Sequence, residues 1–182
     1  MPQPITDIQQ HLVTLLGDNL SKNFTVMMAQ EVSSNPEWLA VLTDIMLSEH
    51  TPYNWRAAWV IDHVQQNTPE VIAPILPRLI AALPQVTGNG VRRHILKMAS
   101  TLPVDQLEDG ELADICFKWL QNPATPIANR AHCMEILYRL TCRYHDLANE
   151  LALILEEIII NGSEGEKNKA QKTLQKITPW RR

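Results

Sequence analysis

Residues 54–60 read Asn-Trp-Arg-Ala-Ala-Trp-Val, and a related opening recurs three more times along the 182-residue chain. The later copies read Gly-Val-Arg-Arg-His at 90–94, Ala-Asn-Arg-Ala-His at 128–132 and Asn-Lys-Ala-Gln at 168–171. The basic residues that align in these copies, Arg56, Arg92, Arg130 and Lys169, are 36, 38 and 39 positions apart. Self-similarity at a period of roughly 40 residues is typical of stacked helix pairs. The period therefore predicts a helical repeat protein.

Apolar residues recur at steps of three and four along most of the chain, which is the spacing of one helix face. Proline and glycine turns separate the periodic segments. They predict about ten helices, near 5–16, 21–32, 38–46, 55–64, 69–83, 91–102, 110–120, 127–144, 146–160 and 164–177. Thr6 and Gly17 suit the two caps of the first helix, and Pro74 and Pro77 should kink the fifth. Only 6 glycines against 12 prolines disfavour a β-sandwich or barrel, which needs many glycine-rich turns.

The repeated opening resembles the second helix of a HEAT repeat, where a Val-Arg pair precedes small residues and then Leu or Val. The stretches Trp55–Val60 and Val91-Arg92 match this pattern best. The segment Ile75–Ile80 resembles the first helix of such a unit, in which a proline often introduces a bend. The resemblance is good over 37–177 and weaker over 1–36. It implies an all-α fold, a right-handed α-solenoid of about five antiparallel helix pairs.

One feature of the family pattern is missing. Many HEAT units hold an aspartate about six residues before the repeat arginine, and this chain has His50, Val86 and Ala124 at those positions. The side-chain ladder that the aspartate makes with the arginine is therefore not expected here.

No long polar linker interrupts the helical pattern, so we expect one domain over 1–182. Within it, 1–36 forms a divergent N-terminal pair and 161–182 a basic capping helix and tail. The segment 161–182 carries a net charge of +4, which leaves −8 for the rest of the chain. Capping units need a polar outer side, and the lysine-rich last helix suits that position.

The resemblance implies that the second helices line the concave side of the solenoid. The row Arg56, Arg92, Arg130 and Lys169 is then a candidate site for an acidic peptide or phosphates, although anchoring loops and helix ends within the stack is the favoured role. Arg93 is an extra cation outside this row and a better candidate for partner contact. Trp55 precedes a repeat arginine and is expected to be partly exposed.

These features favour a non-catalytic scaffold that presents a helical-repeat surface to a protein or peptide partner. The alternative is nucleic-acid binding through the arginine row and the basic C-terminal helix, with Trp180 beside Arg181 and Arg182 stacking on bases. The net charge of −4 does not favour it. The simpler interpretation of the tail is a solvated cap in which Trp180 packs.

An enzyme with an unrecognised site is a weaker alternative, because no phosphate-binding glycine loop, nucleophile elbow or zinc motif occurs. No cofactor is expected. His94 and His132 occupy matching repeat positions roughly 10 Å apart, too far to share a metal ion. The five acids between Asp105 and Asp114 suit the start of a helix, whose dipole favours them. Cys116, Cys133 and Cys142 are interpreted as buried reduced thiols.

Targeting signals are not visible. The N-terminal residues lack a basic and then apolar signal segment. The most apolar stretch, Leu151–Ile160, is far shorter than the roughly 20 residues needed to cross a bilayer. We therefore expect a cytoplasmic protein without a membrane partner, as a monomer or a weak homodimer.

Overall fold

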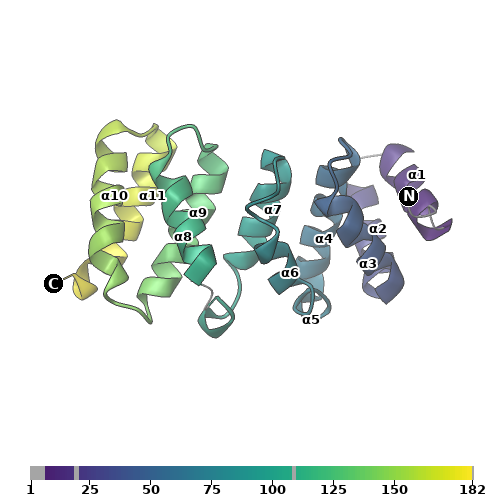
Figure 1. Cartoon of the computed structure of the whole chain (residues 1–182), viewed down its shortest axis with the longest axis horizontal. Helices are drawn as coiled ribbons and strands as arrows, with labels where there is room; N and C mark the ends of the chain where they lie inside the picture. The colour runs from purple at the N-terminus through teal and green to yellow at the C-terminus, as the bar shows by residue number, and fades with distance from the viewer. Residues whose placement is uncertain (1–6, 19–20, 108–109, 182) are drawn as a thin grey trace. The chain divides into compact units, whose positions relative to one another are not determined.

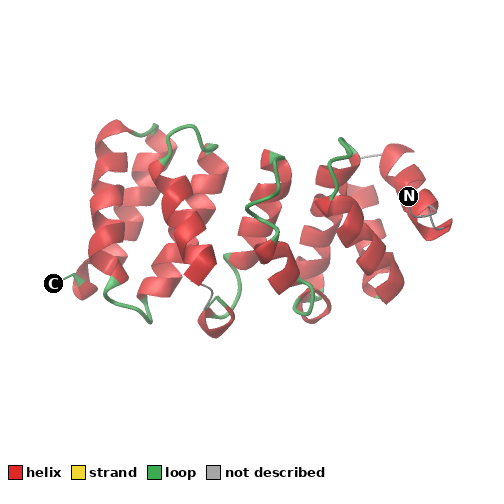
Figure 2. Cartoon of the chain, viewed as in Figure 1, coloured by secondary structure: helices red, strands yellow, loops and turns green. Residues whose placement is uncertain are grey.

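The computed structural model describes residues 7–18, 21–107 and 110–181, and its regular structure within these ranges is entirely helical (Figure 2). The α-helices, labelled in Figure 1, are α1 (Asp7–Asp18), α2 (Lys22–Ser33), α3 (Pro36–Leu47), α4 (Tyr53–Asn67), α5 (Pro69–Ile72), α6 (Leu76–Ala81), α7 (Asn89–Ala99), α8 (Gly110–Gln121), α9 (Ile127–Thr141), α10 (Leu147–Asn161) and α11 (Glu164–Ile177). Two short 3₁₀ helices, η1 (Val104–Gln106) and η2 (Thr178–Trp180), complete the structure. The predicted all-α solenoid of helix pairs is confirmed.

The predicted fifth helix is two helices, α5 and α6, separated by a turn. Proline lacks the amide hydrogen that an α-helix needs and its ring clashes with the carbonyl four residues earlier. Pro74 and Pro77 act within one turn of each other, so they break the helix instead of bending it. The predicted cap Gly17 is wrong, because α1 continues to Asp18. Thr6 lies outside the described residues.

The chain divides into two compact units, residues 1–98 and 99–182, and each is described by itself. In unit 1, α1 packs on α3 and α2 packs on α4, while α3 and α4 pack against each other. First and second helices thus form two layers. Fully buried leucines and isoleucines fill the space between the helices, among them Leu12, Leu42 and Ile61. That the whole chain is one domain stays a prediction.

Unit 2 repeats this arrangement. The pairs α8–α9 and α10–α11 pack internally, α9 packs on α11, and α8 packs on α10. A capping box begins α11, because Ser163 and Glu166 satisfy each other's exposed helix-end groups. In unit 1 the first-helix layer therefore consists of α1, α3, α5 and α6 and the second-helix layer of α2, α4 and α7, and in unit 2 the first-helix layer consists of α8 and α10 and the second-helix layer of α9 and α11.

The tryptophans lie at the edge of the cores. Trp38, Trp59 and Trp119 are half-buried, although their apolar helix faces predict core packing, and Trp55 is half-buried in line with its expected partial exposure. The wide indole ring reaches past the apolar seam of a short helix. Trp38 meets the His11 ring edge-on at 5.3 Å between centroids, and Trp59 tilts against His63 at 5.9 Å.

Among the described residues, none of the helices is both long and apolar enough to span a membrane.

Candidate interaction surface

The two layers carry opposite charge in each unit. In unit 1 the first helices hold five acids and one cation, whereas the second helices hold five cations and two acids. In unit 2 the first helices hold five acids and one cation, and the second helices hold six cations and three acids. The first helices thus carry −4 and the second helices +3 in both units. This separation makes the second-helix layer the candidate surface for an anionic partner.

Three of the four predicted repeat cations donate to backbone carbonyls, two of them near helix ends and one in the loop between α6 and α7. The Arg56 guanidinium donates to the Leu16 carbonyl at 2.6 Å, near the C-terminus of α1. Arg92 donates to the Val86 carbonyl, and Arg130 donates to the Leu120 carbonyl at 3.1 Å, at the end of α8. Cations are stabilising at helix C-termini because the last carbonyls lack helical partners.

Arg92 has no aspartate six residues before it and donates to a backbone carbonyl at that position instead. Val86, which stands six residues before Arg92 where many HEAT units have aspartate, accepts through its backbone oxygen. A backbone acceptor does not depend on the side chain at that position. The anchoring role of the arginine row therefore survives the loss of the family's acidic residue.

The fourth repeat cation and Arg130 also form ion pairs in unit 2. Lys169 contacts the Glu135 carboxylate on the neighbouring second helix. Arg130 forms an ion pair with Glu166, and both side chains are almost completely buried. Burial alone would raise the pKa of Glu166, but hydrogen bonds from Ser163 and the charge of Arg130 outweigh it and lower this pKa.

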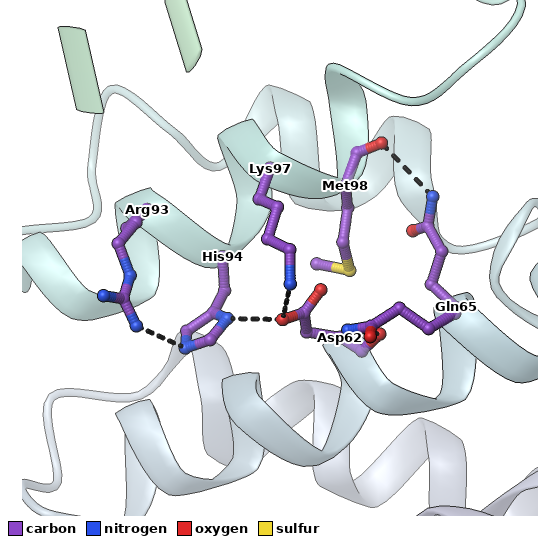
Figure 3. Close-up of polar contacts among 7 residues, drawn as sticks. Asp62, Gln65, Arg93, His94, Lys97 and Met98 are labelled. Atoms are coloured by element: carbon purple, nitrogen blue, oxygen red, sulfur yellow. Dashed lines mark hydrogen bonds and ion pairs between the residues drawn. The ribbon is translucent and has the colours of Figure 1, made fainter. Parts of the chain in front are cut away.

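A buried charge cluster joins α4 to α7 in unit 1 (Figure 3). One Asp62 oxygen, Oδ2, accepts from His94 Nδ1 at 3.1 Å and from Lys97 Nζ at 2.7 Å. The repeat pattern in the sequence does not predict this cluster. Its signal was an acid on the apolar face of α4, beside the buried residues Ile61 and Val64.

The cluster changes the pKa of Asp62 and of the adjacent His63. Burial would raise the pKa of Asp62, but the hydrogen bonds and charges of His94 and Lys97 lower it below its usual value. Burial also lowers the pKa of His63, and Lys97 and Lys22 lower it further, against the opposing effect of Asp62. The charge of His63 is thus suppressed in a neighbourhood that already holds cations.

Arg93 lies exposed on α7, as a partner-binding residue requires. Its guanidinium Nη2 is 3.5 Å from His94 Nε2, as Figure 3 shows. A guanidinium only donates hydrogen bonds, so this arrangement suits the imidazole tautomer with its hydrogen on Nδ1, facing Asp62. Trp55 is half-buried, and the Arg56 guanidinium lies over its ring at 5.7 Å. Partner binding by any of these residues stays a prediction.

The C-terminal tail packs on unit 2. The half-buried ring of Trp180 stacks on His145 at 5.2 Å and lies 6.3 Å from Tyr138. Arg181 pairs with Glu156 on α10 at 2.8 Å. These contacts match the packed-tail interpretation, because they occupy the indole face that base stacking would use. Arg182 lies outside the described residues.

The remaining candidate residues, which are histidines, acids and cysteines, do not form a site together in the described parts of the chain. Within the described ranges, no group of three or more His, Cys, Asp or Glu side chains is placed to hold a metal ion. Acids at Asp105, Glu111 and Asp114 are exposed, and Glu108 and Asp109 lie outside the described residues. Cys116 and Cys133 are buried as predicted, but Cys142 is exposed, because α9 ends at Thr141 and the predicted helical face ends with it.

The layered helix pairs and their oppositely charged layers define an all-helical repeat protein. The HEAT repeat domain model matches residues 12–177, so the chain belongs to the HEAT repeat family. The match includes much of 1–36, where the sequence resemblance is weaker. The structure is also similar to the crystal structure of an engineered protein from the Northeast Structural Genomics Consortium, with a TM-score of 0.52. That likeness covers 96% of this chain and 98% of the other at 14% identity, and supports the fold alone. No curated protein matches the sequence significantly.

Proposed function

We propose that this protein is a non-catalytic interaction module that binds a protein or peptide partner through its second-helix layer. HEAT repeats are in general protein-interaction scaffolds. The observation that carries the proposal is the charge separation, +3 on the second helices against −4 on the first in each unit. Packing between helices does not require such a separation, because Arg56, Arg92 and Arg130 all donate to backbone carbonyls.

The polar groups of this layer support a binding role over a catalytic one. Arg56 and Arg130 hold helix ends, Arg92 holds the loop between α6 and α7, and Asp62 accepts hydrogen bonds from both His94 and Lys97. Groups used in this way are fixed in place and are not available as acids, bases or nucleophiles. The exposed charged side chains of the second helices are mostly cations, among them Lys22, Arg93 and Lys172, which suits recognition of an anionic partner. The cytoplasmic location and the monomeric or weakly dimeric state stay predictions.

Affinity capture with matched charge-reversal variants tests the proposal. The second-layer variant is Arg93→Glu combined with Lys172→Glu, and the first-layer control is Lys118→Glu combined with Arg78→Glu, which makes the same change in net charge. We expect proteins captured by the wild-type protein to be lost with the second-layer variant and retained with the control. Equal losses with both variants would contradict the proposal. Loss of the captured proteins after nuclease treatment would point to a nucleic-acid partner.

A further inference from the structure

The two most exposed large apolar side chains in the described parts of the chain lie on α10, in the first-helix layer of unit 2 (Figure 1). Leu153 is 66% exposed and Ile160 is 73% exposed. They are seven residues apart, so they lie on the same helix face, about 10 Å apart along the helix axis. The opposite face of α10 is already buried in the core, through residues such as Leu151 and Leu155. Packing within the unit therefore does not account for the exposed pair.

Acidic residues accompany this apolar pair. Glu150 and Glu157 are exposed on the same side of α10, three residues before Leu153 and three before Ile160. Neither carboxylate has a hydrogen-bond or ion-pair partner among the residues that the structure describes. The helices α8 and α10 together hold five acids and one cation. We call Glu150, Leu153, Glu157 and Ile160 the α10 outer face, which is both apolar and negatively charged.

A cleft of about 160 Å³ adjoins the α10 outer face and shares Glu157 with it. Leu120 of α8 and Ile154 and Ile158 of α10 give the cleft apolar walls. Arg130 also lines it, but this side chain is 8% exposed and its charge is balanced by the buried ion pair described above. The alkyl chain of a lysine or arginine can lie along such walls while its charge stays near an exposed carboxylate. The cleft therefore suits a long cationic side chain.

We infer that the α10 outer face is a docking site for a helix of a partner protein, with an apolar stripe and Lys or Arg residues on either side of it. The stripe covers Leu153 and Ile160, as when an amphipathic helix binds an apolar surface. The flanking cations complement the acids of the face, and one of them enters the cleft beside Glu157. The site lies on the first-helix layer, so it goes beyond the proposed function and does not depend on it.

The charge of the α10 outer face argues for this occupant over a second copy of the same chain. Two outer faces in contact would bring their carboxylates together, and like charges across an interface are destabilising. The cation-rich second helices do not offer the required stripe either. In the described ranges, their large exposed apolar residues are Met27 on α2 and Ile127 on α9, which are on different helices.

Fluorescence anisotropy with a labelled synthetic peptide tests the site. The probe is three repeats of Leu-Lys-Ala-Lys-Leu-Ala-Lys, in which the leucines fall on one helix face with lysines on both sides. A second peptide with Gln in place of each Leu keeps the charge and removes the stripe. We expect the wild-type protein to bind the leucine peptide at least about tenfold more tightly than the glutamine peptide, because only the first covers the apolar pair.

Matched variants of the protein locate the apolar contact. Leu153→Gln combined with Ile160→Gln should weaken binding of the leucine peptide about tenfold. The control is Met27→Gln combined with Ile127→Gln, which removes two side chains that are 55% and 53% exposed elsewhere. The control should stay within about twofold of wild type. Circular dichroism should show the same helix content and Tm in both variants, because exposed side chains contribute little to stability.

A second pair of variants tests the charge. Glu157→Gln should weaken binding of the leucine peptide about threefold, as expected for one partly exposed ion pair. The control is Asp114→Asn on α8, which removes the same charge from the same helix layer at another exposed position. It should stay within about twofold of wild type. Equal losses in the two variants would mean that the lysines respond only to net charge, which would contradict a site at Glu157.

The remaining outcomes also decide the inference. If the wild-type protein does not distinguish the two peptides, or if the two apolar double variants weaken binding equally, the α10 outer face is not the docking site. Sedimentation of the wild-type protein tests the other occupant. A dimer that dissociates in the Leu153→Gln and Ile160→Gln double variant would overturn the inference in favour of a second copy of the chain.

Discussion

Glu166→Gln should destabilise unit 2 far more than its near-isosteric shape suggests. Glu166 is 6% exposed and Arg130 is 8% exposed, and their ion pair joins α9 to α11. Glutamine keeps the volume and one oxygen, but it leaves the Arg130 guanidinium buried without a counter-charge. The carbonyl of Leu120 still accepts from Arg130, so one hydrogen bond of the guanidinium is retained.

The magnitude follows from two contributions. Removing one partner of a buried ion pair typically costs 3–5 kcal/mol, because the other charge stays desolvated. The Glu166 carboxylate also accepts from the Ser163 amide at 2.9 Å in the capping box, and weakening this contact costs about 0.5–1 kcal/mol more. The retained carbonyl bond offsets part of the loss. We expect about 3–4 kcal/mol, which corresponds to a fall in Tm of roughly 6–16 °C.

Urea and thermal unfolding followed by circular dichroism measure this loss. The matched control is Glu164→Gln, in the same first turn of α11, where the side chain is 95% exposed and lies 3.6 Å from Lys167. An exposed pair of this kind contributes about 0.5 kcal/mol or less. A double-mutant cycle with Arg130→Met isolates the coupling between the two charges. A loss below about 1 kcal/mol for Glu166→Gln, or one equal to the control, would refute the reasoning.

Three further expectations concern other parts of the molecule. Because its pKa is lowered in the folded state, ionised Asp62 stabilises the protein fully above about pH 4, and this stabilisation is lost as the pH falls through the folded-state pKa. The free energy of unfolding of Asp62→Asn should therefore depend less on pH in that range than the free energy of unfolding of the wild-type protein. Trp180→Ala should cost about 1 kcal/mol in thermal unfolding, and an unchanged Tm would contradict the packed tail. In thiol titration of the native protein, Cys142 should react at once, whereas Cys116 and Cys133 should react only on unfolding. Burial raises the pKa of Cys116 well above its usual value.

Most of the fold was predictable because residues that begin or end helices flank most of the helical segments. The periodic apolar spacing and the flanking Pro, Gly and Ser residues located the helices to within a few residues, as at α8 and α11. The departures arise where two local effects compete. At Pro74 and Pro77 each proline alone predicts a kink, but the two together remove adjacent helical hydrogen bonds and break the helix.

The candidate site was only partly predictable. The period identified the repeat arginines, but a linear pattern cannot show that Arg56 reaches the end of α1, 40 residues away. It also cannot show that Asp62 meets His94 and Lys97, since those contacts depend on how α4 packs against α7. An acid on an apolar helix face was the visible signal, because buried carboxylates are nearly always paired.

The repeat and the proposed binding residues follow different rules. Each helix pair has a backbone carbonyl without a helical partner, at the end of a helix or in a loop, and this need for a cation recurs along the chain, so Arg56, Arg92 and Arg130 recur with it. A partner binds at one place, so the residues that recognise it need not recur at the repeat period. Arg93 falls outside the row, lies exposed, and has no counterpart cation at the matching position, Ala131. In a repeat protein the residues that break the repeat are therefore the first candidates for recognition, and those that obey it are the first candidates for stability.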